Sequence, residues 1–381
     1  MGKRTNSVAL LTAMTLLLFG TVVSGVCQRA SNDNGRSATG EIPTVQLAWK
    51  PEEKGPQIGS IAYVLPVQCG GGVPIVRMVA SQPAGELPSL NTLVLLAGDS
   101  GLTRLDVAKA NDTKTAEVRS YFGTDSDVVV LLTGADELKI EKQHYRFIPP
   151  PGSSQAPREI EHTVNRAEQH RYILHFDFTG DLRKVYKLDD AFEYSVVAEF
   201  ASGNLLLGGM PMHGKPQWAI ADSAGTFRGF LTLPNETKLR EDAATLFKAD
   251  GHGSPTAESM FGMTQIVPYR DELVMIPPGK SGVLYVVGEN GVVRTLRLHL
   301  PAGLEPGSAI PSTTSLFLRA NDPTKAKNGM ETGPIYNINL GTGAPLLQYE
   351  TGEVKPSSVL CASGTDFIAL HSEKLWRGAP Q

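Results

Sequence analysis

The serine that most resembles a hydrolase nucleophile is Ser254, in the stretch Gly-His-Gly-Ser-Pro at 251–255. A nucleophile elbow has the pattern Gly-x-Ser-x-Gly, in which a sharp strand-to-helix turn exposes the hydroxyl group. Here a proline follows the serine in a glycine-rich segment, which is typical of an ordinary turn. The sequence therefore predicts no serine nucleophile. The stretch remains a candidate binding loop through His252, because loop insertions often carry ligand contacts.

Histidine and aspartate patterns give little support for a metal site. The close histidine pair, His162 and His170, is eight residues apart, whereas two ligands on one helix need a spacing of four. Asp177 and Asp181 flank a turn that is similar to a calcium loop, but further oxygen ligands at alternating positions are missing. We therefore interpret the aspartates as parts of a structural turn and predict neither a resident metal nor a cofactor.

One turn recurs along the chain and points to the elements that would position any site. Each copy has an acidic residue, then a glycine, then apolar residues ending at an arginine, and a looser copy has Gly341-Thr342-Gly343. The four clear copies are Asp99–Arg104, Asp177–Arg183, Asp222–Arg228 and Glu289–Arg294. Glycine allows the positive φ of a tight hairpin, and an Asp or Asn side chain accepts bonds from nearby amides. The recurrence predicts reiterated β-hairpins.

The spacing of these turns indicates a β-propeller. Their glycines are separated by 79, 45 and 66 residues, and one four-stranded blade takes roughly 40 to 50 residues. We interpret the interval of 79 as two blades whose middle turn has drifted, and that of 66 as a blade with an insertion. Short apolar runs bounded by Gly, Pro, Asn or Asp supply the strands.

The sequence predicts an all-β chain with a single propeller over residues 59–378. At about 45 to 55 residues per blade, this length gives six blades, or seven if they are compact. An eight-stranded barrel and a pair of sandwiches fit the spacing less well. The mostly polar segments Arg158–Gln169 and Lys238–Lys248 are expected to be short helical insertions.

Two phrases carry a resemblance to a known superfamily: His175–Gly180, and Ser195–Leu207 with its Gly203-Asn204 before an apolar run. They resemble blades of the six-bladed superfamily that includes NHL-repeat, TolB-like and gluconolactonase-like propellers. The resemblance implies a six-bladed ring. Gluconolactonase-like members hold a divalent ion through Glu, Asn and Asp side chains around the channel, but no motif here places those residues by number.

The amino terminus predicts export. Residues 1–26 have a basic start followed by the apolar stretch Val8–Val23, which is typical of a signal peptide. Residues 27–58 are rich in Ser, Asn, Gly, Pro and charge, as expected of a flexible tether. Cys27 lies where a bacterial lipoprotein carries its lipid, although Ser24-Gly25-Val26 departs from the usual preceding residues. The alternatives are lipidation of Cys27 and plain secretion after cleavage near Gly25.

The other two cysteines lie near the two ends of the predicted propeller. Cys69 and Cys361 would meet if the ends of the chain share a blade, as in most propellers, and a disulfide would then fasten the ring. The alternative is that both are buried free thiols.

One further segment is a candidate binding loop. Gly208–Trp218 is rich in Gly and Pro and offers His213 and Trp218 to a partner. The alternative is an ordinary connection, with Trp218 in the core between blades.

Charge limits the range of partners. The formal net charge is −4, with 35 basic and 39 acidic residues, and no stretch concentrates Lys or Arg, so nucleic acid is excluded as a partner. Membrane contact would come only through Cys27.

These observations predict an exported, non-catalytic binding or scaffolding protein of the cell envelope, located in the periplasm, at the cell surface or outside the cell. A protein or a small molecule would bind at a propeller face. The alternative is a propeller enzyme of gluconolactonase-like or lyase-like type that uses a divalent metal at the channel mouth.

The mass of the mature amino terminus separates the two fates of Cys27. If the cysteine is lipidated, cleavage leaves Cys27 as the first residue and intact-mass analysis shows the added acyl groups. A mature chain that begins near Val26 without added mass would establish plain secretion.

Overall fold

A computed structural model describes most of the chain beyond residue 40. Residues 42–381 form one compact unit, and the predicted signal peptide and Cys27 fall outside the described part. The described residues are 41–52, 62–79, 92–97, 101–107, 115–147, 158–189, 192–211, 217–235, 263–278, 282–312, 314–324, 333–352, 358–371 and 374–381.

Four sheets of the unit each contain four strands in chain order, paired antiparallel. The first has β2 (Ala62–Gly70), β3 (Val73–Val79), β4 (Thr92–Ala97) and β5 (Gly101–Asp106). The second has β6 (Thr115–Gly123), β7 (Asp127–Phe147), β8 (Arg158–Asp177) and β9 (Leu182–Lys187). The third has β10 (Phe192–Glu199), β11 (Leu205–Pro211), β12 (Gln217–Ala221) and β13 (Phe227–Leu231). The fourth has β14 (Gln265–Tyr269), β15 (Glu272–Ile276), β16 (Val283–Gly288) and β17 (Gly291–Arg297).

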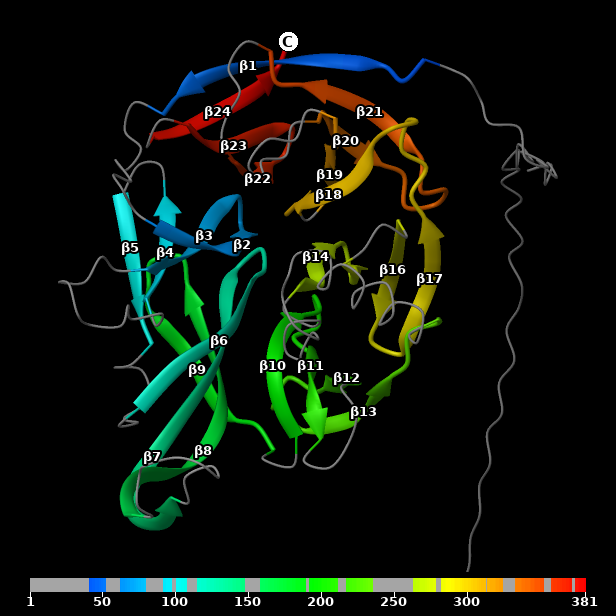
Figure 1. The fold of residues 1–381 in the computed structure, drawn as a ribbon. Coiled ribbons are helices and arrows are strands. Elements are labelled where there is room, and N and C mark those ends of the chain that lie inside the picture. The colour runs from blue at the N-terminus through cyan, green and yellow to red at the C-terminus, as the bar shows by residue number, and fades with distance from the viewer. Residues whose placement is uncertain are drawn as a thin grey trace, which may run out of the picture. The chain divides into compact units, whose positions relative to one another are not determined.

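The remaining sheet has eight strands and consists of two such four-stranded units side by side. One unit contains β18 (Glu305–Ile310), β19 (Leu316–Asn321), β20 (Ile335–Ile338) and β21 (Pro345–Glu350). The other contains β22 (Ser358–Ser363), β23 (Asp366–His371), β24 (Lys374–Pro380) and β1 (Thr44–Pro51). Figure 1 shows the units following one another around a ring. The fold is a single β-propeller, and the predicted all-β class is confirmed.

The two ends of this unit meet in one sheet. β1 pairs antiparallel with β24, with Leu47 opposite Pro380, and parallel with β21. β1 therefore lies inside the segment 27–58 that we expected to be a tether, so the expected boundary at residue 59 is too late. The polar composition of that segment does not predict a strand, because β1 is stabilised by pairing with β24 at the other end of the chain.

A disulfide fastens the same junction from the inside. Cys69 of β2 and Cys361 of β22 are bonded, with their Cα atoms 5.7 Å apart. Both side chains are buried in a cluster with Val76, Leu360 and Ile368. The first strands of the first and last units are thus joined covalently, across the junction that β1 and β24 close through backbone pairing.

The core lies between successive units. Strands alternate side chains between two faces, and in this ring both faces of a unit meet a neighbour. Val129 and Leu131 of β7 pack in one cluster with Leu205 and Leu207 of β11, on the next unit. Outer strands such as β9 are mostly exposed.

The recurrent turn lies between the third and fourth strands of successive units. Asp177 Oδ1 accepts bonds from the amides of Thr179 and Asp181, both at 2.9 Å. Asp222 Oδ1 accepts from two amides in the same way, and Asn339 Oδ1 accepts from Gly341 N at 2.7 Å. The sequence shows five such turns, because the unit with β1 takes its fourth strand from the amino terminus.

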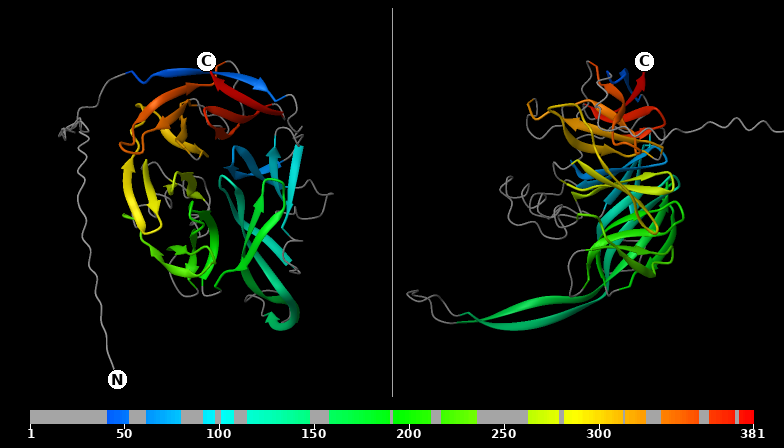
Figure 2. Two further views of the ribbon diagram at one scale, coloured as in Figure 1. Left: turned by 180° about the vertical axis from the view of Figure 1, so that it is seen from behind. Right: turned by 90° about the vertical axis from the view of Figure 1, so that its right-hand side faces the viewer.

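Two expectations for the stretch after Gly101 are wrong. The interval of 79 residues up to Gly180 contains one unit with a long hairpin, β7 and β8, and not two blades. Arg158–Gln169 belongs to β8 and is not a helix, because its backbone pairs residue by residue with β7, as far as Phe147 opposite Arg158. Figure 2 shows this hairpin extending away from the other sheets.

The segment Lys238–Lys248 lies outside the described residues. Within the described residues, no helix has the length and apolar composition needed to cross a membrane.

Removing the disulfide should destabilise the ring. The bond closes a loop with a sequence separation of 292 residues, and crosslinks over long loops contribute about 4 kcal/mol by restricting the unfolded chain. We expect the double variant Cys69→Ala/Cys361→Ala to unfold at lower denaturant concentration than the parent. Reductant should bring the parent to the variant's midpoint and leave the variant unchanged. An unchanged parent midpoint after verified reduction would contradict the assignment.

Candidate functional site

Six turns of the described chain gather where the first strands of the units meet. In each unit, the turn between the first and second strands lies at one edge of the sheet. Neighbouring first strands, such as β2 with β6 and β6 with β10, contact one another. We call these the inner turns; they comprise residues 71–72, 124–126, 200–204, 270–271, 311–315 without 313, and 364–365.

The inner turns line two cavities. The larger cavity has a volume of about 650 Å³ and is lined from β6–β7, β10–β11, β14–β15 and Thr314. The smaller cavity, of about 340 Å³, is lined from β2–β3, β22–β23, Asp125, Ser312 and Thr314. Asp125 and Thr314 line both cavities, so the two volumes are adjacent parts of one site. Together they involve the inner turns of all six units.

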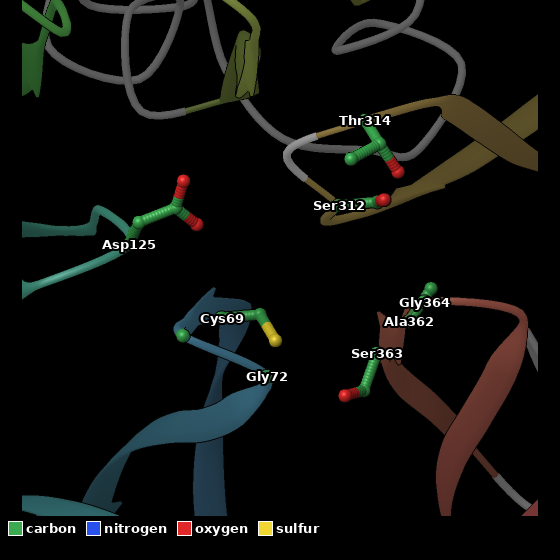
Figure 3. A pocket seen from close by; sticks show the side chains of 9 residues that line it. Cys69, Gly72, Asp125, Ser312, Thr314, Ala362, Ser363 and Gly364 are labelled. Atoms are coloured by element: carbon green, nitrogen blue, oxygen red, sulfur yellow. The ribbon is translucent and has the colours of Figure 1, made fainter.

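The smaller cavity is polar and lies against the disulfide. Figure 3 shows Asp125, Ser312, Thr314 and Ser363 around it, with Cys69 of the disulfide beside Gly72. These side chains come from four different units. The cavity offers hydroxyl groups and one carboxylate to a ligand.

The larger cavity is acidic and partly apolar. Among its described lining residues, the carboxylates are Asp125, Asp127, Glu199 and Glu272, and the cationic side chain is Arg270. Apolar surface comes from the exposed Ala201 and the half-buried Pro268.

Three charged groups of the larger cavity have partners close by. Arg294 Nη2 donates to Glu272 Oε2 at 2.8 Å. The guanidinium of Arg270 lies over the ring of Tyr269, 5.2 Å from its centroid. Asp127 Oδ2 accepts a hydrogen bond from Ser126 Oγ at 3.2 Å.

Glu199 differs from the other carboxylates. Its side chain is only 9% exposed, and His175 lies beside it, with Nδ1 3.9 Å from Oε1. That distance is too long for a hydrogen bond, and no described residue donates one to this carboxylate. Burial, reinforced by the charge of Asp127 and opposed by Lys184, raises the pKa of Glu199 to about 7.

His175 lies behind Glu199 on β8 and is also incompletely satisfied. Its Nε2 is buried and has no hydrogen-bond partner among the described residues. Burial and the nearby Lys184 lower the pKa of His175, and Asp127 opposes them. At neutral pH a neutral imidazole therefore faces the Glu199 carboxyl group.

The turn that follows Glu199 is held tightly. Phe200 N donates to Asn204 O at 2.9 Å, and Gly203 has a φ of 85°. A Cβ at residue 203 would lie at an ordinary contact distance of 3.7 Å from Glu199 Oε1, so glycine is required here by the positive φ of the turn and not by space. Asn204 Nδ2 donates to Glu289 Oε2 at 2.6 Å, which fixes this turn to the next unit.

This arrangement suits recognition of a positive group, or proton transfer at near-neutral pH. It does not form an evident metal site, because no group of three His, Cys, Asp or Glu side chains in the described part of the chain is placed to hold an ion.

Of the three residues predicted as binding candidates, the structure describes Trp218. His213 and His252, like Cys27, lie outside the described residues. Trp218 of β12 is 4% exposed and packs in the core between units, so its ring is not presented to a partner, contrary to the binding-loop interpretation. The buried alternative for this tryptophan is the observed one.

Sequence reasoning missed Glu199, His175 and Asp125. Glu199 and His175 both lie in the phrases that carried the propeller resemblance, but nothing in their spacing of 24 residues brings them together. An available signal was an acidic residue at the end of an apolar strand, just before a glycine turn. Side chains at such strand ends line the inner turns.

Among known proteins, the chain shows similarity to solved structures and to no family model or curated protein. No family model matches the chain, and no curated protein matches it significantly. It is similar to virginiamycin B lyase from Staphylococcus aureus, with 11% identity, coverage of 87% of this chain and 98% of that chain, and a TM-score of 0.38. It is also similar to the WD40 domain of Neurospora crassa Pan2, with 12% identity, coverage of 88% of this chain and 95% of that chain, and a TM-score of 0.35. A third similar structure is YCF48 bound to D1 peptide, with 10% identity, coverage of 90% of this chain and 98% of that chain, and a TM-score of 0.34. At these TM-scores the likenesses carry no argument, and the fold assignment rests on the strand pairing of the chain itself.

The environment of Glu199 predicts a pH-dependent effect of Glu199→Gln. A carboxyl group whose folded pKa is raised binds its proton more tightly when folded, so it lowers stability as pH rises from its unfolded pKa toward about 7. Glutamine removes this loss. Between pH 5 and pH 8, the free energy of unfolding of the variant should therefore rise relative to the parent, by at most about 3 kcal/mol.

Denaturant unfolding at both pH values measures this difference. Glu193→Gln, on the same strand but with a half-exposed side chain, is the matched control for the change of charge. A Glu199→Gln difference that stays constant from pH 5 to pH 8 would refute the assigned environment.

Proposed function

We propose that this chain is an exported binding protein whose ligand occupies the site formed by the inner turns. The observation that carries the proposal is the convergence of all six inner turns on two adjoining cavities. Ligand sites in proteins typically have volumes of about 300 to 1,000 Å³ and a few polar groups among apolar ones. The larger cavity has this size and composition.

The finer parts of the proposal rest on the sequence. Residues 1–26 would direct export, and Cys27 would be either a lipid-bearing first residue or an unmodified residue of a chain secreted after cleavage near Gly25. The protein would then act in the periplasm, at the cell surface or outside the cell. The Cys69–Cys361 bond suits such an oxidising compartment.

We also propose that the ring has six blades. The support is the six four-stranded units among the described residues, with the last one completed by β1. The partner would be a protein or small molecule that reaches the inner turns from the edge of the sheets on which these turns lie.

An enzymatic function remains the second proposal. One observation favours it: the Glu199 carboxyl group, with its pKa raised to about 7, lies beside a buried imidazole, which is a pairing suited to general acid or base catalysis. The metal-dependent version has no three-residue ligand group among the described side chains. Metal analysis of the purified chain and assays on lactones separate this proposal from simple binding.

A substitution that fills the cavities tests the binding proposal. Thr314 is exposed and lines both cavities, so Thr314→Trp adds bulk without changing charge. Ala302→Trp is the control, because Ala302 is exposed in the connection between β17 and β18, which leaves the sheets at the opposite edge. Thermal unfolding is followed with monosaccharides and with blocked amino-acid amides of every side-chain class.

At least one class of compound should raise the Tm of the parent and of Ala302→Trp by several degrees at saturating concentration, and leave Thr314→Trp unaffected. If every compound leaves the parent's Tm unchanged, or if Thr314→Trp responds like the parent, the inner turns are not the binding site.

A further inference from the structure

The larger cavity carries an excess of negative charge near Glu199. Glu272 is compensated by Arg294, and the guanidinium of Arg270 lies over the ring of Tyr269. Among the described lining residues, the carboxylates of Asp125, Asp127 and Glu199 then outnumber the one positive charge of Arg270, so the potential in the cavity is negative. A cavity with low-dielectric walls concentrates such a potential and attracts the opposite charge.

Glu199 is the member of this group that is built to meet a ligand. Its side chain is 91% buried, lines the cavity, and receives no hydrogen bond from a described residue. A buried carboxylate without a partner carries a desolvation cost that a bound donor would remove. The lack of a described hydrogen-bond donor at Glu199 and the acidic lining of the cavity are separate observations. Both indicate that the ligand carries a positive charge.

The neighbours of Glu199 on other strands do not supply the missing partner. From β8, His175 lies too far for a hydrogen bond and is kept neutral by burial. From β9, Lys184 donates to Ser223 O and lies over the ring of Tyr186, so it acts on Glu199 through space only. From β7, Asp127 adds a further negative charge.

The apolar part of the lining limits the kind of cation. The exposed Ala201 and the half-buried Pro268 line the same cavity as Glu199. A ligand with a charged end and an aliphatic stem would place the charge at Glu199 and the stem on this apolar surface. The cavity, at about 650 Å³, accommodates a group of that size.

We propose that the larger cavity binds an organic cation, a primary ammonium or guanidinium group on an aliphatic stem, with Glu199 as its principal partner. The inference rests on the proposed binding function and names the class of ligand for the same site. Binding strengthens as Glu199 loses its proton, since only the carboxylate form pairs with the cation.

Calorimetry with small probes tests the inference on the full chain. The probes are the N-acetyl methylamides of lysine, arginine, norleucine and glutamate. Norleucine keeps the aliphatic stem of lysine without its charge, and the two cationic probes distinguish ammonium from guanidinium. Each is titrated at pH 6 and pH 8 into the parent, Glu199→Gln and the control Glu193→Gln.

We expect a cationic probe to bind the parent at least tenfold more tightly than norleucine at pH 8. Since the ionised fraction of a group with a pKa of about 7 changes about tenfold between pH 8 and pH 6, the affinity should fall by a similar factor at pH 6. Glu199→Gln should abolish the preference for the cation, and Glu193→Gln should retain it.

Equal affinity for norleucine, a preference for glutamate, or an unchanged cation preference in Glu199→Gln would overturn the inference. In those cases the proposed binding function stands if a compound of the wider panel raises the Tm of the parent and leaves that of Thr314→Trp unchanged. Absence of binding by all four probes overturns the cation inference, and the proposed function falls as well only if the wider panel also fails to bind.

Discussion

The fold depends on closing the ring at one junction. β1, from the amino-terminal end of the folded unit, supplies the fourth strand of the last unit by pairing with β24. Without it, that unit would expose an unpaired strand edge. The Cys69–Cys361 bond joins the first strands of the two units at the same junction. Backbone pairing on the outside and a covalent link on the inside thus hold the described units in a fixed arrangement, which keeps the inner turns together.

A closed ring also explains how an unfavourable side chain can be retained. Glu199 lies between two units whose cores, with residues such as Val129, Leu131, Leu205 and Leu207, are packed together. The carboxyl group is held by those contacts in a position that costs desolvation energy. Carboxyl groups whose pKa is raised by burial are common at functional sites. The binding energy of a partner for Glu199 would offset that cost.

Much of the architecture could be predicted from the chain because it depends on local chemistry. The turn glycines at 180, 225 and 291 have the positive φ that the repeats imply, and the neighbouring aspartates accept the expected amide bonds. Two features could not be predicted because they depend on distant pairing. β1 is too polar to be identified without β24, and β8 is polar enough between 158 and 169 to resemble a helix until its pairing with β7 is known. The site could not be predicted for the same reason, because Glu199 and His175 meet only through the packing of two units.

The most direct test of this account is the titration of Glu199 itself, by NMR of the full chain with labelled glutamate side-chain carboxyl carbons. The resonance is assigned by its loss in Glu199→Gln. The account predicts an apparent pKa of about 7 for the free protein, falling when a saturating cationic probe is added, because a paired cation favours the carboxylate. An apparent pKa near the ordinary glutamate value in the free protein, unchanged by the probe, would contradict it.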